Sequence, residues 1–494
     1  MSRSWESILR TAIAGTARSP VPEAVCAALH VVPAGDPAQT GLQALPAAWL
    51  LQKAAAPVAK APAPLLPACP PDERPLCSAE AVKCLKAMLL LQVYPGVLPE
   101  FFALLHQSGR RLPPENIPLA LDYAAHQKKH TGLIREALGP CGGWLAAQHP
   151  EWATLYTPMT PDWQTGSPDE RLGLLREIRG NRPSIGIAWL GNTWSRERPE
   201  HKTAFLETLR TGLSMADEVL LQTAAQDKNQ AVRRLAGRLL LLLPGSAWYN
   251  AIHTWLKAKL QAGLHGRRLY GVLLHGLSEA GRPEELGSLP AGEAGVQTLL
   301  ELLPPQMIAS ASGMPPAVLL QETGAADYPG PARDAWLSAI GWNGDPVWLL
   351  EVVRIFQDQP THPVWTSMPM KTILQALPEP LWQSVMPELA QRFEHFETPA
   401  SALVQALLEA EYSWPKRLLE AVLFYPLRSQ RPRQWAPPGH LQALLKRAAY
   451  RCHPADADVL PAADSEWPYA WHSELIQLRS VIHFRQRLRV ALAP

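Results

Sequence analysis

The sequence predicts an all-α fold, organised as an α-solenoid-like stack of short antiparallel helix hairpins with degenerate repeats. Residues 213–244 carry two amphipathic patterns separated by a polar turn, which is typical of a helix hairpin. Similar apolar patterns with helical spacing recur along the 494 residues, whereas sustained strand-like alternation is absent from the sequence. The 50 prolines favour many short helices separated by turns and argue against long coiled coils.

The pattern at 213–244 predicts where each helix of the hairpin begins and which face it buries. Ser214 and Asp217 form a capping-box pattern, in which side chains satisfy backbone N–H groups at a helix start. Asp227 is expected to cap the second helix, with Gln230 at its third position. The first helix should bury Val219, Leu220, Thr223 and Ala224. The second should bury Val232, Leu235, Ala236, Leu239, Leu240 and Leu243.

The combination of Asp227, Val232, Arg233 and Ala236 resembles the signature of HEAT-type repeats. In those repeats, the Asp between the helices and the Arg of the second helix typically form a ladder between neighbouring units. Such a ladder fixes the register of hairpins that cannot bury their apolar faces alone. The alternative interpretation is an ordinary antiparallel helix hairpin within a larger α domain.

The rest of the chain is expected to form further helices, and changes in composition suggest four regions. An N-terminal helical region covers 1–160 and contains a proline-rich connector at 57–77, which we expect to be extended. The HEAT-like repeats occupy 161–262, where Ser167, Pro168 and Glu170 predict a helix start. Residues 263–330 are frequently interrupted by Gly and Pro and are expected to be irregular, and a C-terminal helical region covers 331–494.

Composition and charge argue against several classes of protein. Apolar residues make up 47% of the chain and charged residues 18%, with a net charge of +2, so neither a disordered acidic protein nor a globally basic one is indicated. No apolar run is long enough to cross a membrane, and the N-terminus lacks a signal-peptide pattern. The six sparse cysteines form no CxxC pair, so we expect reduced thiols and a cytoplasmic location.

The sequence predicts no catalytic, cofactor-binding or metal site. His126 and His130 have the i, i+4 spacing of two metal ligands, but a third ligand is not evident, and a solvated helix face is the favoured interpretation. The spacing of Cys69, Cys77 and Cys84 matches no common zinc pattern. Phosphate-loop and GxSxG motifs are absent from the sequence.

The segment from Trp414 onward is basic, with twelve Lys and Arg against six Asp and Glu. A basic surface of this kind could bind nucleic acid phosphates, and the alternative is a solvated helix face or a set of ion pairs between repeats. The arginines concerned are Arg428, Arg431, Arg433, Arg479, Arg485, Arg487 and Arg489.

Four groups of residues together resemble an uncharacterised bacterial family, DUF 5691, with a HEAT-like architecture. The phrases are Ala12–Thr16 with Arg18; Trp144–Gln148 with Pro150 and Trp152; Trp163–Pro168; and Phe205–Glu207 with Leu213, Ser214, Asp217, Glu218 and Val232–Arg234. The resemblance carries no catalytic residues. Genes of similar proteins tend to lie near those for a SWIM zinc-finger protein, a MoxR-type AAA+ ATPase and a von Willebrand factor A protein, which implies a protein partner from such an assembly.

The leading hypothesis is therefore a cytoplasmic, non-enzymatic helical-repeat scaffold or adaptor that binds protein partners. The basic C-terminal segment motivates a second hypothesis, a nucleic-acid-binding helical repeat with a role in DNA repair. An enzyme whose site is assembled from distant residues is a third, weaker hypothesis.

Overall fold

The computed structural model describes residues 3–54, 68–126, 130–156, 163–263, 268–279, 281–287, 289–325, 327–425, 437–460 and 471–493. Within these ranges the regular secondary structure is helical, and β pairing is confined to the isolated bridges Leu76–Arg111 and Trp414–Cys452. The all-α prediction is therefore confirmed. None of the helices in these ranges combines the length and the apolar composition needed to cross a bilayer.

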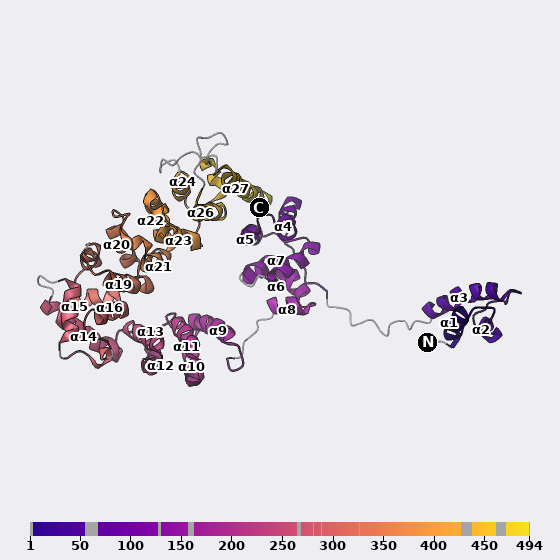
Figure 1. Ribbon diagram of the computed structural model, residues 1–494, viewed down its shortest axis with the longest axis horizontal. Coiled ribbons are helices and arrows are strands. Elements are labelled where there is room, and N and C mark those ends of the chain that lie inside the picture. Colours follow the sequence, from indigo (N-terminus) through magenta and orange to yellow (C-terminus); the bar gives the residue numbers. More distant parts are fainter. Residues whose placement is uncertain are drawn as a thin grey trace. The chain divides into compact units, whose positions relative to one another are not determined.

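The chain divides into two compact units, Met1–Cys69 and Pro70–Pro494. Most of the proline-rich connector, up to residue 67, lies outside the described residues. Unit 1 contains α1 (Arg3–Ala14), α2 (Glu23–Ala28) and α3 (Pro37–Ala54) (Figure 1). Its buried core is small and consists of Ile8, Val21, Cys26, Leu29, Ala44 and Ala48.

Unit 2 begins with five helices that share one hydrophobic core with the C-terminal helices of the same unit. These are α4 (Ala79–Leu90), α5 (Leu98–Gln107), α6 (Ile117–His126), α7 (Thr131–Ala146) and α8 (Pro150–Tyr156). Ser78 caps α4 by accepting a hydrogen bond from the Ala81 N–H at 3.1 Å. A side-chain cap at this position satisfies a backbone donor that the helix itself cannot pair.

The middle of unit 2 continues with eight further α-helices in chain order. They are α9 (Pro168–Asn181), α10 (Pro183–Thr193), α11 (Pro199–Thr208), α12 (Glu218–Ala224), α13 (Gln230–Leu241), α14 (Ala247–Gly263), α15 (Leu269–Ser278) and α16 (Glu293–Leu302). The predicted start of α9 is confirmed, because Ser167 and Glu170 form a capping box and Pro168 is the first helical residue.

The remaining α-helices in the described residues of unit 2 lie between residues 305 and 491. They are α17 (Pro305–Ser312), α18 (Pro316–Gln321), α19 (Gly330–Asn343), α20 (Pro346–Phe356), α21 (Met368–Ala376), α22 (Glu379–Ala390), α23 (Ala402–Glu409), α24 (Lys416–Leu423), α26 (Gly439–Arg451) and α27 (His472–Ala491).

Residues 263–330 are more regular than expected, since α15, α16, α17 and α18 lie within them. This corrects the expectation of an irregular region. The helices are short, and Pro305 and Pro316 each occupy a first helical position, where proline costs no hydrogen bond. Packing of Leu299, Leu300 and other side chains into the main core stabilises helices whose local sequence signals are weak.

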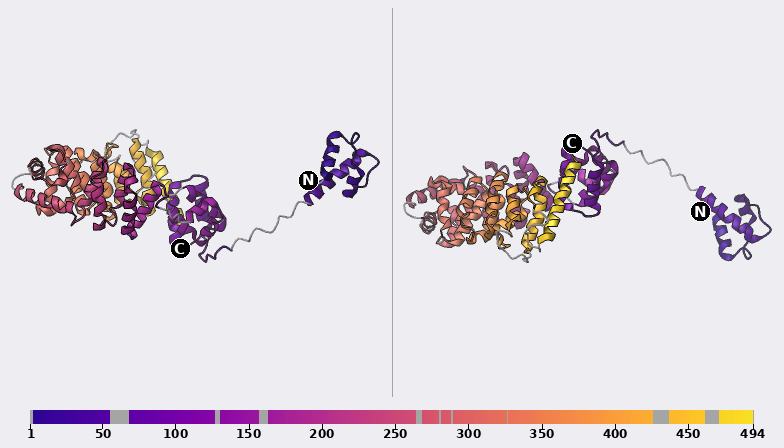
Figure 2. Two further views of the ribbon diagram at one scale, coloured as in Figure 1. Left: turned by 90° about the horizontal axis from the view of Figure 1, so that it is seen from below. Right: turned by 90° about the horizontal axis from the view of Figure 1, so that it is seen from above.

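Contacts between helices follow a regular order along unit 2. One series of contacts runs through α9, α11, α13, α16, α19, α21, α23, α26 and α27, each packing against the next. Other helices pack between or beside members of this series, as α12 does against α13 and α24 against α26. The last helix, α27, also contacts α4, and in Figure 2 the yellow C-terminal helix lies against the purple helices at the start of unit 2.

The hairpin at 213–244 forms as predicted in its second helix and differs in its first. All six residues expected on the apolar face of the second helix are buried, including Leu243, which follows the end of α13. The capping box of Ser214 and Asp217 is confirmed, but it opens a short 3-10 turn, η5 (Met215–Asp217), before α12 begins. In the helix that follows, Leu220, Leu221 and Ala224 are buried, whereas Val219 is 76% exposed and Thr223 is also exposed.

The start of α13 requires a second correction. Asn229, rather than Asp227, is the capping residue, and its Oδ1 accepts hydrogen bonds from the backbone N–H groups of Ala231 and Val232. The Asp227 carboxylate instead accepts from the Asn229 N–H at 2.8 Å. Asp227 therefore shapes the turn that places Asn229 at the cap.

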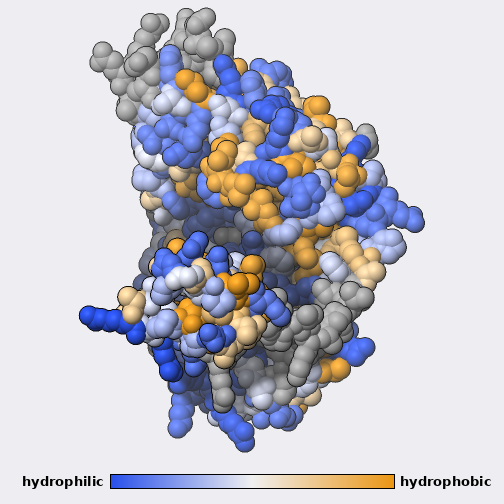
Figure 3. Space-filling model, turned by 90° about the vertical axis from the view of Figure 1, so that its right-hand side faces the viewer, coloured by the Kyte–Doolittle hydropathy of each residue, from blue (hydrophilic) through white to orange (hydrophobic). Residues whose placement is uncertain are grey.

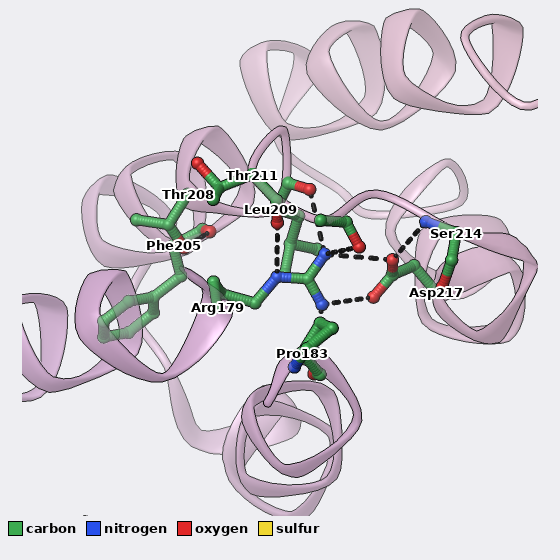
Figure 4. A network of polar contacts seen from close by, with 9 residues as sticks. Arg179, Pro183, Phe205, Thr208, Leu209, Thr211, Ser214 and Asp217 are labelled. Carbon is green, nitrogen blue, oxygen red and sulfur yellow. Dashed lines mark hydrogen bonds and ion pairs between the residues drawn. The ribbon is translucent and has the colours of Figure 1, made fainter. Parts of the chain in front are cut away.

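A buried arginine connects α9 to the start of α10, to the segment after α11 and to η5 (Figure 4). Arg179, on α9, donates two hydrogen bonds to the Asp217 carboxylate, at 2.8 Å and 3.0 Å. Its guanidinium also donates to backbone carbonyls, and the acceptors are those of Pro183, Leu209, Thr211 and Gly212. The network satisfies backbone carbonyls in the segment that follows α11, where no regular helix pairs them.

Candidate functional site

The four predicted ladder residues have two kinds of contact. Val232, Arg233 and Ala236 pack or form hydrogen bonds within the hairpin, whereas Asp227 connects the hairpin to the preceding helix α11. Val232 and Ala236 are fully buried. The Asp227 carboxylate accepts a hydrogen bond from Lys202 Nζ, on α11, at 2.6 Å. Burial acts to raise the pKa of Asp227, but the hydrogen bonds from Lys202 and Asn229 outweigh it, and the pKa lies below its usual value.

Arg233 stays within its own hairpin. It donates to the backbone carbonyls of Asp227 and Lys228, at 2.7 Å and 2.8 Å. The contact from Asp227 to the neighbouring helical unit is therefore made by Lys202, and Arg233 stabilises the turn between α12 and α13.

The arginines predicted as a basic surface divide into two sets. Arg428, Arg431 and Arg433 lie outside the described residues. Arg479, Arg485, Arg487 and Arg489 all lie on α27, where Arg479 is half-buried. The four arginines of α27 are therefore the part of the predicted basic surface whose position the structure describes.

Arg485 is 5% exposed, which corrects the expectation that it lies on the surface. Its NH1 donates to the carbonyls of Ala449 and Cys452, each at 2.8 Å, and its Nε donates to the Glu100 carboxylate on α5. Arg489 reaches the same carboxylate at 2.7 Å, and Arg487 pairs with Glu80 on α4. These three arginines therefore connect α27 to α4 and α5.

A groove of about 820 Å³ lies beside α13, between α11 on one side and α16 on the other. Its wall from α16 contains Ala294, Thr298, Glu301 and Leu302, at the i, i+4, i+7, i+8 spacing of one helical face. The segment before α16 adds Glu285, in η6 (Glu284–Leu286), and Leu289 and Pro290. The α11 wall contributes Thr203, Ala204 and Glu207.

The inner surface of the groove is partly apolar, with Leu235, Trp248, Leu289 and Leu302 among its lining residues. Gly237 permits the close approach of α13 to its neighbours, because a Cβ there would lie 3.1 Å from the Trp248 ring and 3.4 Å from Leu302. A larger residue at position 237 would push against both side chains. Exposed hydrophobic residues also occur elsewhere, interspersed with hydrophilic ones (Figure 3).

Arg238 is the most unusual charged residue of the groove. Its guanidinium lies over the Trp342 ring at 4.0 Å, and Arg210 approaches the same ring at 4.4 Å. Its NH2 nitrogen is buried and has no hydrogen-bond partner among the described residues. Burial lowers the pKa of Arg238 to about 10, although Glu301 and Glu207 act to raise it.

The groove offers groups for recognition. Arg234 and Arg238 lie four residues apart on α13, and Glu285 and Glu301 lie on the opposite wall. Within the described residues, these four charged side chains make no ion pair with one another or with other groups. No cluster of three or more His, Cys, Asp or Glu side chains suited to a metal ion occurs in the described parts of the chain.

Sequence reasoning did not predict this groove. The sequence places Arg234 and Arg238 off the apolar face of α13, which is correct, but the opposite wall comes from the segment with weak helix signals. The i, i+4 spacing of two arginines on either side of a glycine was the available signal.

A comparison with protein families shows a match over residues 7–492 to the family of unknown function DUF5691. The chain belongs to DUF5691. The match includes both the small N-terminal unit and α27, so the resemblance noted from four groups of residues extends over nearly the whole sequence. No curated protein and no solved structure gave a significant match.

Proposed function

We propose that this DUF5691 protein is a non-enzymatic, cytoplasmic scaffold or adaptor built as an α-solenoid-like stack, and that it binds a protein partner. The observation that carries the proposal is the groove beside α13, where Arg234, Arg238, Glu285 and Glu301 make no ion pair within the described residues and lie around a partly apolar surface. Arg238, Glu285 and Glu301 are half-buried, and charges partly removed from water are costly when unpaired, so this surface is best explained by groups that a partner supplies.

The order in which helices pack against one another supports the stacked architecture. From α9 to α27, members of one helix series pack successively against one another, as expected when hairpins bury their apolar faces against neighbours. Stacks of this kind present extended surfaces, which suits a scaffold. The partners proposed are the MoxR-type AAA+ ATPase and the von Willebrand factor A protein suggested by the family's gene neighbourhood.

Reconstitution with these candidate partners tests the proposal. The full chain is co-expressed with each protein from the native genome, and complex formation is measured by size-exclusion chromatography and calorimetry. We expect a stoichiometric complex with one of them. Absence of a complex with both, together with a salt-dependent shift of duplex DNA, would instead support the nucleic-acid-binding hypothesis.

A groove-filling variant sharpens this experiment. Ala294 is exposed on the groove wall, so Ala294→Trp places a large side chain in the groove without displacing the core. Ala317, exposed on α18 outside the groove lining, gives the matched control Ala317→Trp. The proposal predicts weaker complex formation for the first variant and unchanged complex formation for the second.

A further inference from the structure

Three grooves of unit 2 differ in whether the arginines that line them form ion pairs. In the groove between α20 and α22, Arg392 pairs with Asp358 at 2.9 Å and Arg354 pairs with Glu351 at 2.7 Å. In the groove beside α4 and α27, Arg487 pairs with Glu80. In the groove beside α13, by contrast, Arg234, Arg238, Glu285 and Glu301 make no ion pair within the described residues.

Arg238 also differs from the other deeply placed arginines. Arg179, Arg333 and Arg485 each donate to at least two backbone carbonyls. Arg238 stacks on Trp342 instead, with one buried nitrogen left without an acceptor. The guanidinium of Arg238 lies over the Trp342 ring, and a carboxylate is the group that best matches the fork geometry of guanidinium donors.

We propose that the groove beside α13 binds an amphipathic α-helix of a partner protein. An acidic side chain of that helix pairs with Arg234 and Arg238, and a basic side chain pairs with Glu285 and Glu301. The inference rests on the proposed protein-binding function and assigns the site and the chemistry of the partner.

The form of the groove favours a helix over other shapes. Its walls are helices, and α16 presents Ala294, Thr298 and Leu302 along one face, as a helix does toward a helical neighbour. Apolar anchors of the partner at i, i+3 or i+4, and i+7 would contact Leu235, Trp248 and Leu302. No sheet edge is present in the described parts of the chain to which an extended peptide could add a strand.

The charge distribution disfavours a nucleic acid as the occupant. Glu207, Glu285 and Glu301 line the groove together with the arginines. A phosphate backbone placed there would pass close to three carboxylates, and like charges in such positions disfavour binding. A helix with acidic residues on one flank and basic residues on the other can pair with the arginines of one wall and the glutamates of the other.

The test uses the full chain and a displayed library of helix-favouring peptides whose positions on one face are randomised. We expect the selected peptides to share an apolar stripe with an acidic residue on one flank. Arg238→Glu should weaken their binding by about tenfold or more, because a partly buried charge pair is lost and replaced by repulsion. Replacing the acidic residue of the peptide with Lys should restore binding to this variant.

Matched controls separate a specific site from a general loss of structure. Arg417→Glu, at an exposed arginine of α24, should leave peptide binding unchanged, as should Ala317→Trp. Ala294→Trp should abolish binding while the helical circular dichroism spectrum stays that of the unaltered chain. Selected peptides that bind Ala294→Trp and Arg238→Glu as tightly as the unaltered chain would overturn the inference, and so would a library that yields no binder.

The two proposals fail in different ways. If the Ala294→Trp variant forms the native complex normally, the proposed scaffold function stands, and the groove is not the binding site. If selected peptides show the expected charge pattern, and a Lys in the peptide restores binding to Arg238→Glu, the groove is supported as a helix-binding site. This holds even if neither the AAA+ ATPase nor the von Willebrand factor A protein binds.

Discussion

Arginine side chains in unit 2 hold the loops between helices by donating to backbone carbonyls. Arg179 donates to carbonyls of the segment after α11, Arg333 to those of the turn before α19, and Arg485 to those at the end of α26. The last carbonyls of a helix have no partner within it, and a guanidinium carries five N–H donors in a fixed arrangement. Where several carbonyls converge, one arginine replaces several separate caps.

The Arg179–Asp217 pair predicts a large effect of a small substitution. Asp217 is fully buried, so Asp217→Asn leaves the charge of Arg179 without a counter-charge. We expect unit 2 to lose roughly 3–5 kcal/mol of stability, measured from the denaturant midpoint by circular dichroism. Asp358→Asn, in an exposed ion pair with Arg392, is the control and should change the midpoint little. Equal effects of both would contradict the prediction.

His395 predicts a pH dependence of stability. Its side chain is 1% exposed, lies 4.4 Å from the Trp365 ring, and neither ring nitrogen has a hydrogen-bond partner among the described residues. Burial, and then the charge of Arg392, lowers the pKa of His395 from 6.5 to about 4. Below pH 6.5 the unfolded chain binds a proton that the folded chain does not, so stability should fall as the pH drops from 6.5 to 4.

Replacing His395 isolates this contribution. His395→Phe removes the titrating group without losing a hydrogen bond, so its stability should decline less than that of the unaltered chain between pH 6.5 and 4. Denaturant midpoints of both proteins across this range provide the measurement. Parallel profiles would show that other groups cause the decline.

At the scale of elements, α27 is the helix whose contacts reach furthest along the chain. Glu100 on α5 accepts from Arg485 and Arg489, and Ser78 donates to the Ala491 carbonyl at 2.8 Å. Glu100→Gln should destabilise this contact by roughly 2–3 kcal/mol, because Arg485 remains buried without its carboxylate. Increased hydrogen exchange in α27 and α5, with a lower denaturant midpoint, is the expected observation.

Glu80→Gln provides the comparison for Glu100→Gln. Glu80 pairs with the exposed Arg487 on the same helix α27, and water screens this pair. Hydrogen exchange in α27 should therefore change little. A similar increase for both variants would mean that the charge of Glu100 has no special role.

At the scale of the whole molecule, the hydrophobic cores respect the division of the chain. The core of unit 1 lies within residues 8–48, and the buried members of the two cores of unit 2 begin at Cys77. A fragment of residues 70–494 should therefore keep its helical content and its denaturant midpoint, because no core residue is removed. Aggregation of the fragment, or a clearly lower midpoint, would show that unit 2 needs residues 1–69 to fold.

The sequence predicted those parts of the molecule that local interactions determine. The start of α9 depends on Ser167 and Glu170, three residues apart, and the buried face of α13 follows from helical periodicity. Local patterns were less reliable at α12, where a 3-10 turn changed which residues are buried and left Val219 in solvent.

The tertiary structure alone decided which charges are paired and where a groove lies. From the sequence, Arg485 was expected on the surface. In the structure it is buried and donates to Glu100, which lies 385 positions away in the sequence. The groove depends on α11, α13 and α16 lying next to one another, and the last of these has weak helix signals. Helical periodicity is a property of neighbouring residues, whereas ion pairs and grooves arise from segments that only packing brings together.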